Sequence, residues 1–436
     1  MDVEHSVRSD ASAVKLLAVS FCFPPLAYPR SIQVARLLKH LRSKTVLVCA
    51  DEKGARQDHT IDASAEEHLM ACLRLPFSAD GSRSPLGKVL SRLDAPLWNK
   101  APDQYTSWKP SVLRAVDSFA QDEAYTPNML VTFGHPMSDH LIGLELQRRY
   151  LIPWVAHFSD PWVDNSYNRY DSVTRRLNAY LEKKVITSAD RVIFTSQETS
   201  DLVLSKYPEE FRKKAKVIPH SFDESLYPRG PETREPELTV RYIGEFYGKR
   251  TPKPLIETLR AILASAPQLL TGVRFELIGP VNPTIVAESG LESLPEGLVV
   301  IKPAVNYRDS LQLAASADGL LLVDAPAKKS VFLASKLIDY VGAAKPILGI
   351  TPPGSAAALI GELGGWIADP TDPEEMRREL TNFLRYLSAN KEKRYEVWGD
   401  PSVRKRYEAP VVAACFENMF EELVSNAIHE TAKPES

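Results

Sequence analysis

Cysteine is scarce in this chain of 436 residues, which contains only 4. The four thiols stand far apart, at Cys22, Cys49, Cys72 and Cys415, and no two of them form a C-x-x-C pair. Zinc knuckles and disulfide frameworks need closely or regularly spaced cysteines, so both are excluded. The scarcity fits a protein of the reducing cytoplasm.

Long hydrophobic runs are also missing. The most apolar early stretch, Leu16–Phe23, is too short to cross a membrane and is followed at once by two prolines. A buried parallel strand explains it better than a signal peptide, which is the less favoured alternative. We therefore expect a cytoplasmic protein, or one bound peripherally at the inner face of the membrane.

The third absence is a surplus of charge of either sign. Lys and Arg number 53 against 56 Asp and Glu, which gives a net charge of −3. Proteins that bind nucleic acids usually carry a basic surplus that neutralises phosphates. We therefore expect no nucleic-acid partner.

What remains is an ordinary globular composition, 44% hydrophobic and 25% charged. From Val14 onward, short apolar or β-branched runs alternate with longer helical stretches, which is typical of βαβ units around a parallel sheet. Strands are expected at Val14–Ser20, Val46–Cys49, Leu69–Leu75, Met129–Phe133, Trp154–Phe158, Val192–Thr195, Leu238–Ile243, Arg274–Ile278, Val299–Ile301, Gly319–Val323 and Pro346–Ile350. Helices are expected at Ser31–Leu41, Ser138–Tyr150, Ser172–Ser188, Gln197–Tyr207 and from Pro252 onward.

The length exceeds the roughly 250 to 300 residues at which one hydrophobic core usually stops growing. A stretch rich in proline and charge, 228–237, interrupts the alternation and predicts a linker. We expect a disordered tail over 1–13, a first domain over 14–227, a second over 238–398, and a helical segment over 399–430 that crosses back to the first. The fold class is α/β, with two Rossmann-like doubly wound domains facing each other across a cleft.

The segment 81–100 departs from this rhythm because its apolar residues recur at helical spacing among basic ones. This pattern predicts a basic amphipathic helix. It is either a surface helix packed on its own domain or a peripheral contact with an anionic membrane.

Residues that follow strands are informative, because doubly wound folds bind ligands beyond the carboxyl ends of their strands. After the first strand, Tyr28 and Arg30 are expected to point into the cleft, although a rigid proline-rich turn explains this loop nearly as well. After Met129–Phe133 comes His135, which can donate or accept a hydrogen bond at neutral pH. A lone histidine is more often structural, but its place after a central strand makes it a candidate.

Two loops of the second half predict anion sites. Gly244, Arg250 and Lys253 lie just before or at the start of a helix, where free N–H groups and the helix dipole add to the side-chain charges. Solvated charges in a turn are the alternative. Further on, Lys336 is expected in the first turn of a helix, where it opposes the dipole unless an anion is bound, and Asp339 follows on the same face.

The segment Ser335–Pro346 resembles the S-K-x-x-E-Y-x-x-x-G-K-P motif of the family-4 retaining GT-B glycosyltransferases. Val217–Asp223 is similar to the I-x-N-G-x-D of that family, and Tyr242–Gly244 precedes its basic residue, Arg250. Asp160–Trp162 resembles the D-P-W of a subgroup that acts on lipid-linked or surface-glycan acceptors. The likeness extends over nearly the whole chain.

The resemblance implies that Asp339 holds the donor ribose, that 333–336 cradle the diphosphate and that Arg250 neutralises it. Val305 falls where the family contacts the nucleotide base. His135 lies beside the position of the family's histidine that contacts the donor sugar. With the loop analysis, this gives catalytic residues His135, Arg250 and Lys336, donor-binding residues Gly244, Lys253, Val305, Leu333, Ala334, Ser335 and Asp339, and acceptor residues Tyr28, Arg30 and Asp160.

His157 and Ser159 interrupt the D-F-R-D-P-W of the subgroup, and three further positions depart from the family pattern. Asp339 replaces a glutamate, Glu245 stands where arginine is common, and Val331 replaces the first acid of the E-x₇-E motif. Val331 removes a contact to the transferred sugar, which leaves the identity of that sugar open.

The resemblance implies a retaining glycosyltransferase that moves a hexose from a nucleoside diphosphate sugar to the hydroxyl of a cell-surface glycan, a lipid-linked or another acceptor. The sequence contains no Asp-x-Asp pair to hold a divalent metal against the diphosphate, so we expect no metal or other cofactor. Two alternatives are a nucleotide-sugar epimerase on the same fold and a non-catalytic partner subunit, for which Val331 is the only support.

Overall fold

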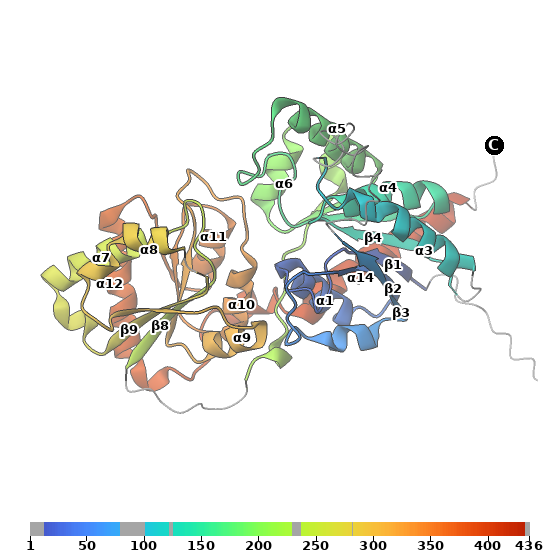
Figure 1. Ribbon diagram of the computed structural model, residues 1–436. Coiled ribbons are helices and arrows are strands. Elements are labelled where there is room, and N and C mark those ends of the chain that lie inside the picture. Colours follow the sequence, from blue (N-terminus) through green and yellow to red (C-terminus); the bar gives the residue numbers. More distant parts are fainter. Residues whose placement is uncertain (1–12, 79–100, 122–124, 229–236, 281, 432–436) are drawn as a thin grey trace, which may run out of the picture.

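The computed structural model describes residues 13–78, 101–121, 125–228, 237–280 and 282–431. The expected tail up to residue 12, the basic segment 81–100 and residues 229–236 of the linker lie outside this part of the chain. The described residues form two lobes that lie side by side in Figure 1, each built around one parallel sheet with helices on both faces. The α/β fold class with two doubly wound domains is confirmed.

The sheet of the first domain has seven strands in the order β3-β2-β1-β4-β5-β6-β7, and all of its pairs are parallel. Its strands are β1 (Lys15–Val19), β2 (Lys44–Glu52), β3 (Ala71–Phe77), β4 (Met129–Phe133), β5 (Trp154–Phe158), β6 (Arg191–Phe194) and β7 (Ala215–Val217). The helices of this part are α1 (Pro29–His40), α3 (Lys109–Gln121), α4 (Ser138–Tyr150), α5 (Ser172–Ser188) and α6 (Gln197–Leu204).

The sheet of the second domain has six parallel strands in the order β10-β9-β8-β11-β12-β13. They are β8 (Leu238–Ile243), β9 (Val273–Ile278), β10 (Val299–Lys302), β11 (Gly319–Val323), β12 (Ile347–Ile350) and β13 (Trp366–Ala368). The helices are α7 (Lys253–Ser265), α8 (Pro283–Ser289), α9 (Tyr307–Ala315), α10 (Ser335–Ala343), α11 (Ser355–Glu362) and α12 (Pro373–Ala389), followed by α13 (Pro401–Lys405) and α14 (Ala409–Thr431). None of the helices in the described residues is both long and apolar enough to cross a membrane.

The C-terminal helix α14 belongs to the core of the first domain. Its residues Phe416, Phe420 and Leu423 are buried in one cluster with Leu16 of β1 and Val131 of β4. Glu417 of the same helix is also buried. Its carboxylate accepts hydrogen bonds from the backbone N–H groups of Arg42 and Ser43, just beyond the end of α1. The chain thus passes through the second domain and returns to the first.

Strand order reverses direction between β1 and β4 in the first sheet and between β8 and β11 in the second. At such a switch point the loops leave toward opposite faces of the sheet and open a crevice beyond the strand ends. His135 and Arg250 lie in the loops after β4 and β8, and Arg30 and Lys336 lie in the first turns of α1 and α10, the helices that follow β1 and β11. The topology therefore places these predicted residues at the two switch points.

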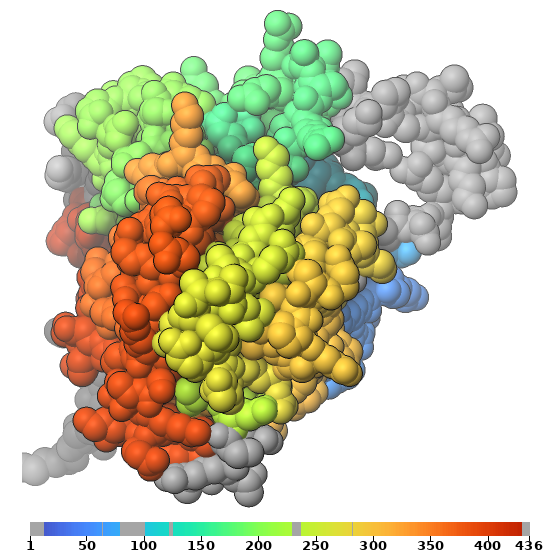
Figure 2. Space-filling view, turned by 90° about the vertical axis from the view of Figure 1, so that its left-hand side faces the viewer, coloured from blue at the N-terminus to red at the C-terminus, as the bar shows by residue number. Residues whose placement is uncertain are grey.

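The two domains touch at several places. In Figure 1, α1 of the first domain lies beside α9 and α10 of the second, and an ion pair of 2.5 Å joins Arg36 of α1 to Asp339 of α10. Elsewhere the hydroxyls of Ser196 and Thr199 both donate to the backbone oxygen of Val331, each over 2.7 Å. Figure 2 shows the second domain from its outer side, with the green residues of the first domain above it.

Candidate active site

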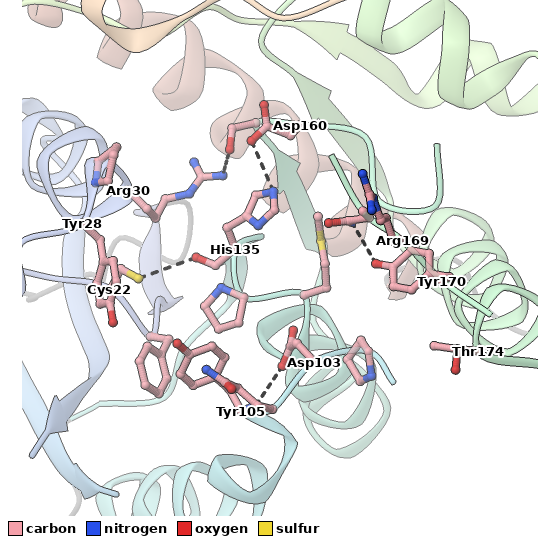
Figure 3. Close-up of a pocket in the computed structure, with 18 of the residues that line it drawn as sticks. Cys22, Tyr28, Arg30, Asp103, Tyr105, His135, Asp160, Arg169, Tyr170 and Thr174 are labelled. Atoms are coloured by element: carbon pink, nitrogen blue, oxygen red, sulfur yellow. Dashed lines mark hydrogen bonds and ion pairs between the residues drawn. The ribbon is translucent and has the colours of Figure 1, made fainter. Parts of the chain in front are cut away.

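A cavity of about 770 Å³ lies at the switch point of the first domain. Figure 3 shows that residues from the loops after β1, β4 and β5 surround it, together with residues 102–105 and 168–174. Four of the predicted site residues line it, namely Tyr28, Arg30, His135 and Asp160. The structure therefore brings His135 and the three predicted acceptor residues together around one cavity.

His135 faces Asp160 inside this cavity, with 3.2 Å between Nε2 of the histidine and Oδ2 of the aspartate (Figure 3). Burial raises the pKa of the Asp160 carboxyl, but the contact with His135 and the charge of Arg30 outweigh it and hold the pKa below its usual value. Asp160 is therefore ionised at neutral pH. His135 has a φ of 65°, an uncommon conformation for a residue with a side chain, and such positions cluster at functional sites.

Arg30 is almost fully buried at the start of α1, with 4% of its surface exposed. Its Nη1 lies 3.2 Å from Nδ1 of His157, and its Nη2 donates a hydrogen bond to the hydroxyl of Ser159. Burial lowers the pKa of Arg30 to about 10, and Asp160 opposes that shift. The guanidinium is still charged at neutral pH.

An aromatic wall closes another side of the cavity. Phe21 and Tyr105 lie with their ring centroids 4.4 Å apart, and both line the cavity. Tyr28 is half-buried beside them, and its hydroxyl donates to Oε2 of Glu52 over 2.9 Å. The cavity thus combines an apolar surface with a few fixed polar groups, as ligand sites usually do.

A second candidate site lies at the switch point of the second domain and contains Lys336. Its amine lies 3.0 Å from the hydroxyl of Tyr242 and 4.4 Å above the ring of that tyrosine, and it forms no ion pair within the described residues. Burial, together with the nearby charge of Arg250, lowers the pKa of Lys336 to about 7. A cation held in this way gains most from an anionic ligand.

Gly244 leaves the space that the amine of Lys336 occupies. A Cβ atom at position 244 would lie 2.3 Å from Nζ of Lys336, closer than any real contact allows. The residue also has a φ of 153°, which disfavours other residues. The glycine therefore lets Lys336 reach the backbone at the end of β8.

Arg250 is buried near Lys336, and two side chains contact its guanidinium. Its Nη2 lies 3.0 Å from Oδ1 of Asp324, which directly follows β11, and its guanidinium carbon lies 4.9 Å from the ring centre of Tyr247. Burial lowers the pKa of Arg250, but Asp324 and the neighbouring tyrosines outweigh it and raise the pKa above its usual value. Arg250 therefore keeps its charge at any pH of interest.

The other predicted donor residues surround this cluster to different degrees. Helix α10 begins at Ser335 and has Ala334 as its N-cap, with no side-chain hydrogen bond to its first turn, and Leu333 is buried just before it. Val305 lies in the loop between β10 and α9. Lys253 begins α7 but is exposed, and its amine pairs with Glu257 one turn on, over 3.9 Å. Among the described residues, Lys253 and Lys336 share no hydrogen-bond or ion-pair partner.

Asp339 is engaged with the first domain. Its Oδ1 accepts from Nη2 of Arg36 at 2.5 Å and from the hydroxyl of Tyr307 at 3.2 Å. Burial raises the pKa of Asp339 even though Arg36 opposes the shift. Among the described residues no hydrogen bond reaches Oδ2, and 21% of the side chain is exposed. One carboxylate oxygen is thus open to a ligand.

Sequence reasoning missed Arg36, Asp324 and Tyr307. A charged residue in a half-buried helix usually lies on the exposed face, but the structure buries Arg36. Asp324 follows β11 directly, so the rule that indicated the other loops could have found it. Nothing in the sequence marks Tyr307.

The comparisons with known proteins decide the fold. The sequence matches no protein-family model and none of the curated proteins. Solved structures do match: HepE of Anabaena in complex with UDP and glucose has a TM-score of 0.61 at 15% identity, over 94% of this chain and all of that one. Sucrose-phosphate synthase of Thermosynechococcus elongatus has a TM-score of 0.63 at 15% identity, over 95% of this chain and all of that one. The chain has the GT-B fold.

A third GT-B structure, the lipopolysaccharide outer core galactosyltransferase WaaB, matches 94% of this chain and all of its own at 13% identity, with a TM-score of 0.55. In this GT-B chain the cavity of the first domain and the Lys336 cluster of the second follow switch points of the two sheets. The first offers an arginine, a histidine and an aspartate beside aromatic rings. The second offers two cations and the free start of a helix, which suit an anion.

Proposed function

We propose that this chain is a glycosyltransferase that uses a nucleoside diphosphate sugar as its donor. The observation that carries the proposal is the cation cluster of the second domain, where Lys336 has no ion pair among the described residues and lies at the uncapped start of α10, near Arg250. A diphosphate supplies the negative charge that this cluster lacks. HepE, which shares the GT-B fold, was crystallised with UDP and with UDP-glucose.

A diphosphate bound at this cation cluster would bring the rest of the donor close to the other predicted residues. Oδ2 of Asp339 is open to the ribose hydroxyls, and Val305 lies in a loop beside α9, where the base would be contacted. Gly244, Leu333, Ala334 and Ser335 provide backbone around the diphosphate, and Lys253 adds positive charge at the edge. We propose a hexose as the transferred group.

The acceptor belongs in the cavity of the first domain. We propose that Tyr28, Arg30 and Asp160 bind it there and that His135 contacts the donor sugar. In the proposed retaining reaction, the bond between C1 of the sugar and the diphosphate oxygen breaks, the acceptor oxygen bonds to C1 from the same face, and the acceptor proton passes to the diphosphate. Arg250 and Lys336 stabilise the charge that develops on the diphosphate.

We further propose that these two cations serve in place of a metal ion, so that the reaction needs no cofactor. The acceptor would be a cell-surface glycan or a lipid-linked sugar, and the protein would work in the cytoplasm or peripherally at the membrane. Segment 81–100, which lies outside the described residues, is the part of the chain proposed to contact the membrane.

A thermal-shift screen with UDP, GDP, dTDP and their sugars tests the proposal, because a ligand that binds only the folded state raises the melting temperature. We expect one nucleotide to stabilise the protein. Asp339→Ala and Arg250→Ala should lose that stabilisation and still fold, whereas Arg260→Gln should keep it. Arg260 lies on the exposed face of α7, where it bonds Ser293.

Stabilisation that is unchanged in both site variants would refute the placement of the donor site. Incubation with the donor alone separates transfer from isomerisation. A nucleotide sugar that is epimerised without any acceptor would replace the transferase proposal with an epimerase. No binding of any nucleoside diphosphate would favour a non-catalytic subunit.

A further inference from the structure

Arg30 is a buried cation without an anion of its own. Its guanidinium bonds are to a histidine nitrogen and a serine hydroxyl, and no carboxylate of the described residues forms an ion pair with it. Its Nε is buried and lacks a hydrogen-bond partner. A buried charge is costly unless it is paired, so this arrangement is incomplete as it stands.

The histidine partner of Arg30 is neutral. An arginine can only donate hydrogen bonds, so Nδ1 of His157 must accept, which places the ring proton on Nε2. Burial and the charge of Arg30 hold the pKa of His157 well below its usual value. The second partner, the hydroxyl of Ser159, is neutral as well. Neither partner offsets the charge.

The acids near Arg30 attract its charge, but none of them in the described residues forms an ion pair with it. Asp160 is the acid that most favours the charged guanidinium, but its carboxylate contacts His135 at 3.2 Å. Asp139 is fully buried, and burial raises its pKa well above the usual value, which favours its neutral form.

The start of α1 favours an anion beside Arg30, although Asp103, Asp160 and Asp171 also line the cavity. Arg30 lines the cavity (Figure 3), and it lies in the first turn of α1, which has no side-chain cap and no acidic residue in that turn. The positive end of the helix dipole therefore adds to the guanidinium charge. Arg169 contributes a second arginine at the exposed side of the same cavity.

The opposite wall is apolar and aromatic. Phe21 and Tyr105 contact each other there, and Met137 of the loop after β4 also lines the cavity. A cavity of about 770 Å³ with such a wall accommodates a ligand larger than a single inorganic anion. The ligand therefore has a ring or chain to cover the aromatic wall as well as a charged group.

We infer that the cavity binds an acceptor sugar that carries an anionic substituent, a carboxylate or a phosphate, whose charge pairs with Arg30. The inference rests on the proposed function, since it treats the occupant of this cavity as the acceptor. It narrows the acceptor from any hydroxyl compound to an acidic sugar. Uncharged sugars of the same size leave Arg30 unpaired and bind more weakly.

Calorimetric titration of the full chain tests this with three probes: methyl glucuronide, which carries a carboxylate, glucose 6-phosphate, which carries a phosphate, and methyl glucoside, which is neutral. We expect one of the acidic sugars to bind at least about tenfold more tightly than methyl glucoside, as a charge-assisted hydrogen-bonded pair provides. The two acidic probes distinguish the carboxylate from the phosphate. Added salt should weaken only the acidic sugars.

Arg30→Gln should remove the preference for the acidic sugar, and Arg30→Lys should keep part of it. Arg42→Gln is the matched control, because it removes an arginine from the exposed residues just beyond the end of the same helix, with 73% of its side chain exposed. Melting temperatures of all variants show whether each one folds. If Arg30→Gln does not fold, Arg30→Lys and the salt dependence decide.

Equal binding of acidic and neutral sugars, a preference that survives in Arg30→Gln, or no binding of any of the three probes would overturn the inference. UDP, GDP and dTDP are titrated into the same samples. Nucleotide binding without a preference for acidic sugars leaves the proposed function standing. An acidic-sugar preference without nucleotide binding shows the opposite, that the cavity is right and the transferase proposal wrong.

Discussion

At the scale of single residues, Lys336 has a pKa close to neutral pH, about 7. Burial and the charge of Arg250 lower the pKa of the amine to this value, and a bound diphosphate would stabilise the charged amine and raise the pKa. The protein should therefore take up protons when a nucleoside diphosphate binds above pH 7. Affinity should fall as the pH rises above 7, by at most about tenfold per pH unit. Calorimetry in buffers of different ionisation enthalpy measures both effects.

The matched variant is Lys336→Met, which keeps a long apolar side chain over the ring of Tyr242 and has nothing to protonate. It should bind the nucleotide more weakly, with an affinity that no longer depends on pH in this range except through the phosphate itself. Wild-type binding without proton uptake between pH 7 and 8 would show that the amine does not meet the diphosphate.

A substitution at Gly244 tests the same site by a steric change, without altering any charge. In Gly244→Ala the new Cβ meets the amine of Lys336 and pushes it away, so affinity for the nucleotide should fall by about tenfold, the loss of one charged hydrogen bond. Gly248→Ala is the control, since Gly248 has a φ of 58° and open space around it. Gly248→Ala should lower the free energy of unfolding by about 1 kcal/mol because of backbone strain, and it should leave the nucleotide affinity unchanged. Equal loss in both variants would contradict the steric account.

At the scale of elements, α14 joins the two ends of the chain in one core. Phe420 is fully buried, 5.9 Å from the ring of Phe416, so Phe420→Ala should lower the free energy of unfolding of the first domain by about 3 to 5 kcal/mol. Cys415→Ala, on the exposed side of the same helix, should change it by less than about 0.5 kcal/mol. Urea unfolding followed separately for each domain measures the difference. A shift confined to the second domain would mean that α14 does not stabilise the first.

The central elements could be predicted because they are buried on both faces. Met129–Phe133 and Leu238–Ile243 begin and end as the sequence predicts, since a strand covered by helices on both sides is a continuous apolar run. The edge strands β7 and β13 have only three residues each and were missed. The expected helical segment 399–430 is interrupted before Ala409, whose N–H donates to the backbone oxygen of Phe222 and so leaves the helical pattern.

Some residues of the candidate site could be predicted from the sequence and others could not. Arg250 and Lys336 follow strands of one domain, so the rule for strand ends indicates them from the sequence alone. The pair of Arg36 and Asp339 joins residues 303 positions apart in different domains. No periodicity or motif encodes that distance, because it depends on how the two finished domains pack.

For the whole molecule, this pair connects donor binding to the arrangement of the domains. Oδ1 of Asp339 is held by Arg36 of the first domain, which also donates to the backbone oxygen of Ser221 at 2.5 Å. Arg36 therefore acts as a positioning residue for a carboxylate in the other domain. We expect Arg36→Gln to weaken the binding of a nucleoside diphosphate by about tenfold, although Arg36 does not belong to the donor domain.

A double-mutant cycle separates this coupling from a general loss of structure. Arg36→Gln should have little further effect in the Asp339→Asn background, because the group that it orients has lost its charge. It should also leave the affinity for a 2′,3′-dideoxynucleotide unchanged, since that ligand has no ribose hydroxyls for Asp339. Lys39→Gln is the control one turn further along α1, where the lysine pairs with Asp62 and Asp223 inside the first domain. Additive effects of Arg36→Gln and Asp339→Asn, or equal loss of the dideoxynucleotide, would mean that the ion pair only holds the domains together and does not position the carboxylate for the donor.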